Sequence, residues 1–279
     1  MATPPRHVRM PPFTDTLPAP IYFRAVQVPA DTIYPWHCHQ WGEFVYSFSG
    51  VMEVKLAGSH YLAPPQYGVW LPPRVEHIGQ NRLAAEHSSL YVAQDLCGAL
   101  PKVTCALAVS PLVRAILEQL RRHPPASPPD ASDERLLRVL VDQLAGAQCV
   151  GSYLPMSDDP LLAPVLAMLE ADPADNRSLA QLAQAAHTTE RTLMRRCQRE
   201  LGMTLADWRQ RLRVVRAMAL LEAGRTVEAV ALDLGYASAS AFIAMFRRLT
   251  HETPDEYRKR AGSTGTITGK TTGRSHAHP

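Results

Sequence analysis

The sequence predicts an α+β chain: an N-terminal antiparallel β-barrel, then an all-α domain with two helix-turn-helix units joined by a linker helix. Three observations support this fold class. In residues 21–94, short segments alternate apolar and polar residues between prolines and glycines, which is typical of antiparallel strands. Residues 160–260 have helical periodicity almost throughout, and two segments within them repeat. At roughly 100–200 residues per domain, a chain of 279 residues allows two domains.

The predicted strands are short and regularly interrupted. Ser49-Gly50 lies between two alternating segments and predicts a hairpin at that point. Many short antiparallel strands indicate a barrel or a sandwich. The clearest strands are expected at residues 43–48, 51–56, 67–71 and 89–93.

Two helices are expected after the strands. Ser110-Pro111 combines an N-cap with a first-turn proline, and apolar residues follow at helical spacing. A linker rich in Pro, Ser and Asp (124–132) precedes a second apolar face at residues 136–144. These helices either form a dimer interface or cover the barrel, and the sequence leaves both alternatives open.

Two segments of the all-α region, 178–199 and 226–248, have the same internal spacing. Each has a small residue on a first helix, a turn residue four positions later, and two apolar residues four apart on a second helix. A small residue lets the two helices approach closely, and the apolar pair anchors the second helix, so each segment predicts a helix-turn-helix. The aligned pairs are Ala183 and Ala231, His187 and Gly235, Leu193 and Phe242, and Cys197 and Phe246.

Each unit also has a helix-start signal: Ser178 with Gln181, and Thr253-Pro254 with Glu256, predict capping boxes. The helix predicted at residues 205–222 joins the two units. At 1.5 Å per residue it is about 27 Å long, close to the ~34 Å of one DNA turn.

The positive charge of the chain is concentrated in one segment. Residues 177–260 contain 15 Lys and Arg against 9 Asp and Glu, whereas residues 131–176 contain 2 against 8. A patch that consists mostly of arginine suits contact with phosphates. The chain has no run of ~18 apolar residues and no signal-peptide pattern at its start, so we expect a cytoplasmic protein without a membrane partner.

Five cysteines are scattered along the chain, with no CxxC pair. An odd count without that spacing argues against a disulfide framework or a zinc ribbon. We expect most of them to be buried thiols.

Residues 160–260 resemble the DNA-binding domain of the AraC/XylS family of bacterial regulators. The most specific stretch is VALDLGYASASAFIAMFRRLTHETPDEYR, from Val230 to Arg258. In the first unit, TERTLMRRC at 189–197, ahead of LGMT at 201–204, also matches the family. The resemblance implies a transcription regulator rather than an enzyme, with double-stranded promoter DNA and RNA polymerase as partners.

The resemblance also implies which residues contact DNA. Arginine can read guanine in the major groove and glutamate can accept from cytosine N4, so the first unit is expected to carry most of the base readout. Arg196 and Arg199 are expected at phosphates. The full expected set is Thr189, Glu190, Arg191, Met194, Arg195, Arg196 and Arg199 in the first unit, and Ser238, Ala239, Ser240 and Arg247 in the second.

The chain departs from the family pattern at three positions. His187 and His251 stand where glycine is usual, and Cys197 replaces an aromatic residue. Histidine tolerates positive φ better than most residues, so the turn at His187 should survive.

The barrel segment resembles the cupins. His37-Cys-His-Gln-Trp-Gly-Glu43 is similar to the first cupin motif, and Pro72-Pro-Arg-Val-Glu-His77 to the second, with Arg74 in place of a usual glycine. The resemblance implies that His37, His39, Glu43 and His77 converge inside the barrel. Three imidazoles and one carboxylate suit Ni, Co, Fe, Mn or Zn, whereas Cys38 should point away from the pocket by strand alternation.

These resemblances together imply a regulator controlled by an effector in the barrel. The effector is a metal ion or a small organic molecule, and the pocket could also be unused. The alternative from another class is a cupin metalloenzyme with an accessory helical domain. We expect a barrel domain at 1–105, a helical linker and dimerisation region at 106–158, a DNA-binding domain at 159–261 and a disordered tail at 262–279.

Overall fold

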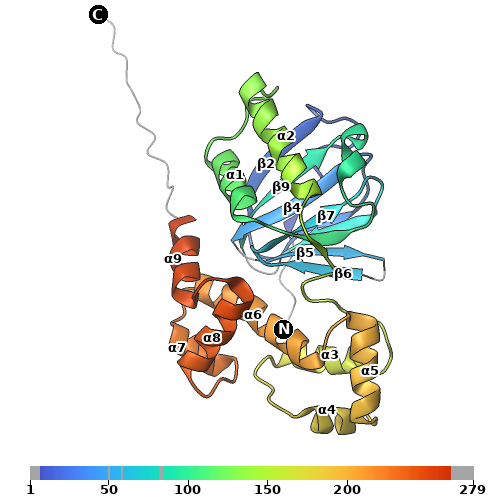
Figure 1. Cartoon of the computed structure of the whole chain (residues 1–279), viewed down its shortest axis with the longest axis vertical. Coiled ribbons are helices and arrows are strands. Elements are labelled where there is room, and N and C mark those ends of the chain that lie inside the picture. The colour runs from blue at the N-terminus through green and yellow to red at the C-terminus, as the bar shows by residue number, and fades with distance from the viewer. Residues whose placement is uncertain (1–6, 50, 58, 82–83, 265–279) are drawn as a thin grey trace, which may run out of the picture.

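The computed structural model describes residues 7–49, 51–57, 59–81 and 84–264. A β-rich barrel domain forms its N-terminal part and a helical domain its C-terminal part (Figure 1), which confirms the predicted α+β class. The strands are β1 (His7–Val8), β2 (Ile21–Val28), β3 (Thr32–His37), β4 (Gly42–Ser49), β5 (Met52–Leu56), β6 (Ser59–Ala63), β7 (Tyr67–Leu71), β8 (His77–Gln80), β9 (Ala85–Val92), β10 (Cys105–Ala108) and β11 (Cys149–Val150).

The helices follow the strands along most of the chain. A short 3-10 helix, η1, spans Gln94–Ala99. The α-helices are α1 (Pro111–Arg122), α2 (Ala131–Ala145), α3 (Leu162–Ala171), α4 (Leu179–Ala185), α5 (Glu190–Leu201), α6 (Leu205–Glu222), α7 (Val227–Asp233), α8 (Ala239–Thr250) and α9 (Pro254–Thr264). Among the described residues, no helix combines the length and the apolar character needed to cross a bilayer.

Two sheets make up the barrel domain. Their strand orders are β1-β3-β8-β5-β6 and β11-β10-β7-β4-β9-β2. Apolar residues from both sheets, among them Val45, Val54 and Leu71, meet in one buried cluster. The sheets therefore pack face to face and enclose the interior of the barrel.

The predicted hairpin at Ser49-Gly50 is wrong. β4 pairs with β7 and β9, whereas β5 pairs with β6 and β8 in the other sheet. Local alternation can identify two consecutive strands but not their partners. In this chain the connection between them, of which Gly50 lies outside the described residues, passes from one sheet to the other.

Helices α1 and α2 cover the outer face of the six-stranded sheet. Along β4, Phe44, Tyr46 and Phe48 point outward and pack with apolar residues of both helices, as the two-residue period of a strand requires. The sequence left two alternatives for these helices, and in the structure they cover the barrel. A role in dimerisation stays a prediction.

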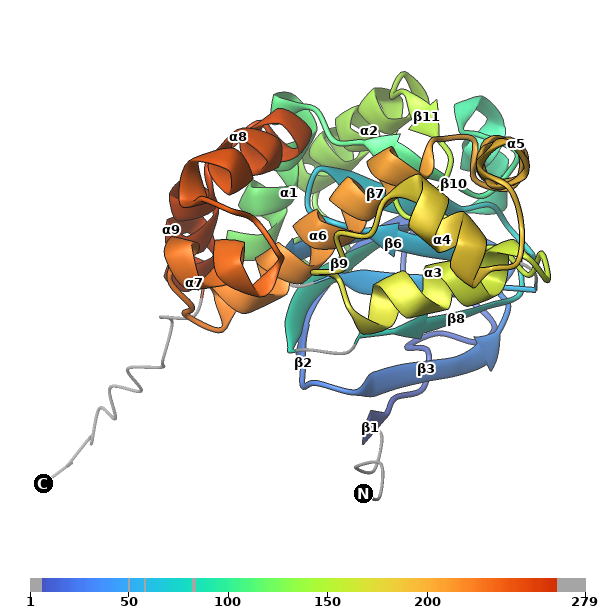
Figure 2. The ribbon, with the colours of Figure 1, turned by 90° about the horizontal axis from the view of Figure 1, so that it is seen from below.

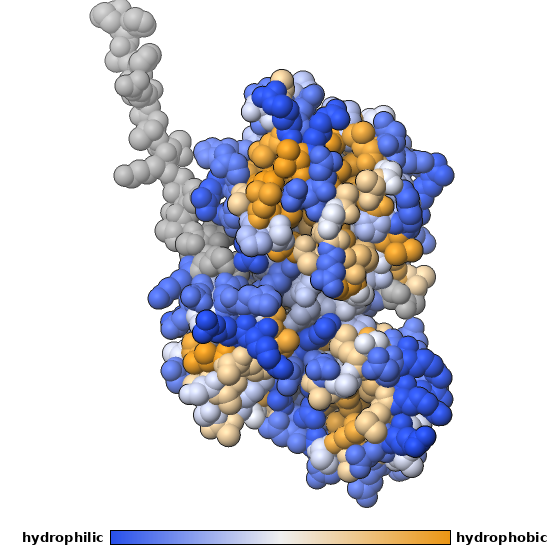
Figure 3. All heavy atoms as spheres, in the orientation of Figure 1, coloured by the Kyte–Doolittle hydropathy of each residue, from blue (hydrophilic) through white to orange (hydrophobic). Residues whose placement is uncertain are grey.

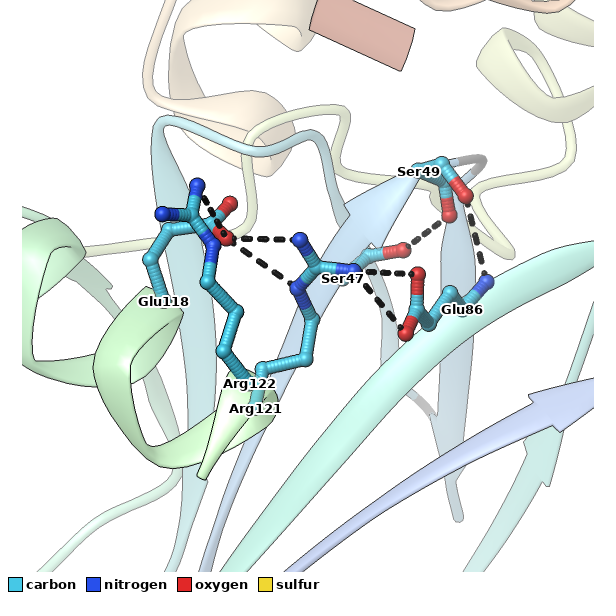
Figure 4. A network of polar contacts seen from close by, with 6 residues as sticks. All are labelled: Ser47, Ser49, Glu86, Glu118, Arg121 and Arg122. Atoms are coloured by element: carbon cyan, nitrogen blue, oxygen red, sulfur yellow. Dashed lines mark hydrogen bonds and ion pairs between the residues drawn. The ribbon is translucent and has the colours of Figure 1, made fainter. Parts of the chain in front are cut away.

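A charged network fastens the end of α1 to the sheet (Figure 4). Arg121 lies 3.1 Å from Glu86 of β9 and 2.9 Å from Glu118 of its own helix. Its guanidinium also stands over the ring of Phe48 at 5.3 Å. Because these groups are only partly exposed, the network fixes α1 against the barrel.

Two cysteines depart from the expectation of separate thiols. Cys105 of β10 and Cys149 of β11 form a disulfide, because these strands are antiparallel neighbours and bring the two Cα atoms to 6.0 Å. Cys97 and Cys197 are buried thiols as expected, and Cys38 is exposed. Since β10 and β11 belong to the six-stranded sheet, the fold of the barrel domain continues past residue 105 to residue 150.

Both helix-turn-helix units form as predicted. α4 and α5 make the first and α7 and α8 the second, with α6 between them. The small residues Ala183 and Ala231 are buried, and so are the four aligned anchor residues on α5 and α8. The capping boxes at Ser178 and Thr253 are also present.

Left-handed backbone closes the turns at the expected places. His187 has φ of 50°, His251 of 63° and Gly235 of 75°. The two histidines thus adopt the left-handed conformation that usually favours glycine. At the end of the domain, α9 continues to Thr264, beyond the predicted start of the tail, and the rest of the predicted tail lies outside the described residues.

The helical domain lies beneath the barrel. Figure 2 shows α3 and α6 crossing in front of the sheet when the molecule is seen from below. Leu62 of β6 is part of the buried core of the helical domain, and Val51 packs against that core. The two domains therefore share an apolar interface.

The interior of the barrel contains a buried histidine. His87 of β9 is 4% exposed, and no hydrogen-bond partner of its Nδ1 is found among the described residues. Burial lowers the pKa of His87 to about 4. The neutral imidazole is therefore the form that the fold accommodates.

Stability should depend on pH through His87. The folded pKa is below the unfolded value near 6.5, so the unfolded chain binds the proton more readily and stability falls as pH drops from about 6.5 to 4. The loss should be about 3 kcal/mol. In chelator-treated protein, the free energy of unfolding in urea should fall less between about pH 6.5 and 4 in His87→Gln than in the wild type, by about 3 kcal/mol. An unchanged slope, equal to that of the exposed-site variant His123→Gln, would refute the prediction.

The second turn should tolerate no side chain at Gly235. A Cβ there would lie 2.5 Å from the carbonyl oxygen of Ala174. Gly224 is the matched control, because its φ of 81° is similar and nothing lies within 4 Å. Gly224→Ala should cost about 1–2 kcal/mol for the left-handed backbone, and Gly235→Ala should cost about 3 kcal/mol or more in urea unfolding. Equal losses would show that the backbone contact is harmless.

Candidate functional site

The four expected ligands come together inside the barrel. His37 ends β3, His39 lies in the connection that follows, Glu43 is on β4 and His77 begins β8. The four potential ligand atoms all lie within 4.8 Å of one another. His39, Glu43 and His77 are buried, and His37 is partly buried. The cluster could therefore hold a metal ion.

Each of the three imidazoles is oriented by a backbone carbonyl. Nδ1 of His37 lies 2.7 Å from the Pro35 oxygen, Nδ1 of His39 lies 2.7 Å from the Trp41 oxygen, and Nδ1 of His77 lies 2.9 Å from the Val75 oxygen. A carbonyl only accepts hydrogen bonds, so each Nδ1 must carry the proton. In the neutral form each Nε2 then presents a lone pair, the arrangement that metal-binding histidines usually have.

These lone pairs face a carboxylate. Glu43 Oε2 lies 3.1 Å from Nε2 of His39 and 3.6 Å from Nε2 of His77. A neutral Nε2 cannot donate to this oxygen, so the contact is favourable only when the imidazole is protonated or a cation lies between the groups.

The electrostatics of the cluster follow from this arrangement. Burial alone would raise the pKa of Glu43, but His39 and His77, which can donate to it from Nε2 when protonated, hold the pKa of this carboxyl well below its usual range through hydrogen bonds and charge. Burial opposes protonation of His77, yet the Glu43 carboxylate raises the pKa of His77. Burial, followed by the nearby His77, lowers the pKa of His37. The cluster thus keeps a carboxylate ionised in the interior.

The cavity around the cluster is small. Its volume is about 40 Å³, which suits an ion and a few waters but is far below the ~300–1,000 Å³ of organic-ligand pockets. Sequence reasoning missed several polar residues of its wall, although inward alternation along β9 could have indicated three of them. The missed wall residues include Arg24, Tyr34, His87, Ser89 and Tyr91.

The second candidate region is the exposed face of α5. Glu190, Arg191 and Arg195 are exposed there, and so is Met194, whose side chain is 52% exposed. Thr189 caps the helix by accepting a hydrogen bond from the Thr192 N–H at 3.3 Å. The face opposite these residues carries the buried anchors, so α5 presents a polar surface away from the core.

Arg196 differs from its neighbours on α5. Its Nη1 lies 2.5 Å from Asp159 Oδ2, and this carboxylate is 5% exposed. Asp159 also accepts from the N–H groups of Leu161 and Leu162 at the start of α3. Arg199 lies near the same carboxylate at 3.4 Å but is more exposed. Arg196 is therefore partly buried against Asp159, and the ion pair ties α5 to the start of α3.

The corresponding face of α8 has few hydrogen-bonding groups. Ser238 caps the helix by accepting from the Ala241 N–H at 3.3 Å, and Ser240 and Arg247 are exposed. Ala239 is partly buried. The structure thus brings the expected residues of both units to helix starts and exposed faces, apart from Arg196 and Ala239.

Comparison with known proteins identifies both domains. Residues 21–148 match the family model of the AraC-like ligand binding domain, and residues 182–260 match that of a helix-turn-helix domain. The HTH-type transcriptional regulator NimR of Escherichia coli is 32% identical over 223 residues, which cover 80% of this chain and 81% of that protein. A putative AraC-like transcription regulator of Streptomyces antibioticus is 33% identical over 159 residues, covering 55% of this chain and 52% of that protein.

Among solved structures, ToxT from Vibrio cholerae is 13% identical, with a TM-score of 0.38, covering 87% of this chain and 99% of that chain. The family models and the E. coli relative decide the assignment. This chain belongs to the AraC-type transcriptional regulators, with an N-terminal ligand-binding domain and a C-terminal helix-turn-helix DNA-binding domain.

Proposed function

We propose that the effector of this regulator is a divalent transition metal ion, held by His37, His39, Glu43 and His77. The observation that carries the proposal is the fixed orientation of the three imidazoles, whose Nδ1 protons are committed to carbonyls. Three neutral Nε2 lone pairs and one carboxylate then converge on one point, where a bound cation would satisfy all four without a second proton on any imidazole. Such a donor set suits Ni, Co, Fe, Mn or Zn.

The size of the cavity favours an ion over an organic effector within the barrel. A volume of about 40 Å³ leaves no room for a molecule of drug-like size. The alternative of a cupin metalloenzyme rests on the same four residues, and membership of a regulator family favours regulation over catalysis. When bound, the ion would supply a cross-link between β3, β4 and β8.

The DNA interface is proposed on the exposed face of α5, supported by α8. Arg191 and Arg195 are the proposed guanine readers and Glu190 the proposed cytosine reader. Met194 offers an exposed apolar group for a thymine methyl. Arg199, Ser238, Ser240 and Arg247 are proposed nearer the phosphates. Contact with RNA polymerase and formation of a homodimer remain proposals drawn from the family.

Metal content should separate these possibilities. Wild-type protein incubated with each divalent ion and then desalted should retain one ion per chain of the preferred metal, measured by elemental analysis. His37→Ala and His77→Ala should bind it more than about 100-fold more weakly, beyond the usual effect of outer-shell partners. His60→Ala is the matched control, because His60 faces Glu53 at 3.4 Å outside the cluster. Full metal content in the two ligand variants, or none in the wild type, would contradict the proposal.

Replacing Arg195 should weaken DNA binding, whereas replacing Arg196 should lower stability. Arg195→Ala should weaken binding to a duplex selected by the wild-type protein from a random pool by about 1–3 kcal/mol, with unchanged stability. Arg196→Ala should instead lower the free energy of unfolding by about 1 kcal/mol, because it leaves Asp159 with fewer partners. Fluorescence anisotropy and urea unfolding measure the two effects. Wild-type DNA affinity in Arg195→Ala would remove this residue from the interface.

A further inference from the structure

A second cavity lies between the two domains, apart from the barrel cluster. Its volume is about 510 Å³, within the ~300–1,000 Å³ typical of small-molecule sites. Apolar surface lies between strongly hydrophilic groups at the junction of the domains on the face drawn in Figure 3. The barrel domain contributes Val51, Glu53 and Leu62. The remaining wall comes from Leu154, which follows β11, from α6, and from the C-terminal ends of α3 and α7 with the residues just after them.

The wall of this cavity is mostly apolar, and several of its side chains are buried in the core. Leu62, Leu212 and Leu234 are at most 5% exposed, and each belongs to the core of the helical domain. Val215 and Leu220 of α6 are partly exposed on the same side. A molecule in the cavity would therefore touch the outer surface of the five-stranded sheet and the linker helix together.

Negatively charged groups outnumber positively charged ones in the wall of this cavity. Three carboxylates, those of Glu53, Glu170 and Asp233, accompany one guanidinium, that of Arg216. Asp233 is neutralised by Arg225, whose Nη2 lies 2.7 Å from its Oδ2.

The other charges of the wall have different partners. Glu53 accepts a hydrogen bond from Gln80 at 2.6 Å. Arg216 donates to the backbone carbonyl of Glu170 at 3.1 Å. Within the described part of the chain, no cation lies within ion-pair distance of the Glu170 carboxylate.

We propose that this cavity is a binding site for a hydrophobic organic cation, with its apolar body against the leucines and its charged group near Glu170. Excess negative charge beside an apolar wall favours such a ligand over a neutral or anionic one. The proposal does not depend on the metal site, since no residue lines both cavities. Because both domains line the cavity, its occupant would stabilise one arrangement of the ligand-binding and DNA-binding domains.

Tetraphenylphosphonium and tetraphenylborate test the proposal, because they have nearly the same shape and opposite charge. In isothermal titration of the full chain, tetraphenylphosphonium should bind at one site and tetraphenylborate at least about tenfold more weakly. Glu170→Gln should weaken phosphonium binding about tenfold. Glu134→Gln, which removes an exposed carboxylate on α2, should leave it unchanged.

Two cavity-filling variants locate the site. Leu220→Trp fills it from α6 and Val51→Trp fills it from the barrel domain, and either should abolish phosphonium binding in a chain that still folds by circular dichroism. His77→Ala should retain phosphonium binding, which separates this site from the barrel cluster. Equal affinity for the two probes, no binding of either, or binding unaffected by Glu170→Gln would overturn the proposal, whether or not the filled variants fold.

Discussion

The guanidinium groups of α6 hold the two helix-turn-helix units in one arrangement. Their partners are backbone carbonyls of the loop at 172–177, which precedes α4. Arg209 donates to the carbonyl of Arg177 at 2.8 Å, and Arg213 donates to that of Pro173 at 2.9 Å. Asn176 of the same loop donates to the carbonyl of Gly235 at 2.7 Å. The turn of the second unit is thereby tied to the loop that precedes the first.

The same helix also contacts the segment that leads from the ligand-binding domain to α3. Trp208 donates to the carbonyl of Pro155 at 2.7 Å, and Arg211 donates to that of Tyr153 at 3.0 Å. The ring of Tyr153 lies 5.5 Å from that of Tyr67 on β7. A ligand can shift DNA binding only if it prefers one arrangement of these contacts. Under the two proposals above, these contacts are the direct connection through which an occupant of either cavity would act on α6.

The helix-turn-helix units could be predicted because their signals are local: a small residue, a turn residue and two anchors within a short stretch. Where a charged side chain points is not set by its neighbours in the sequence. By sequence alone, Arg196, Arg209 and Arg213 belong to a patch suited to phosphates. In the structure they contact Asp159 and loop carbonyls, which are too far away in the chain to be recognised as partners. The predicted hairpin of β4 and β5 was wrong for the same reason, because alternation along a strand does not show which sheet the strand joins. The interdomain cavity combines segments too far apart in the chain to be recognised together.

The barrel site gives a physical reason for one departure from the cupin pattern. Arg74 adopts φ of 67° at a position where glycine is usual, which costs an ordinary residue about 1–2 kcal/mol. Its backbone N–H donates to the His39 carbonyl at 2.8 Å, and its Nε donates to Gln40 Oε1 at 2.8 Å. The arginine therefore adds a side-chain contact that glycine cannot make, and that contact offsets part of the strain. Because Arg74 precedes His77 by three residues, the same bonds hold the segment carrying one proposed ligand against the segment carrying another.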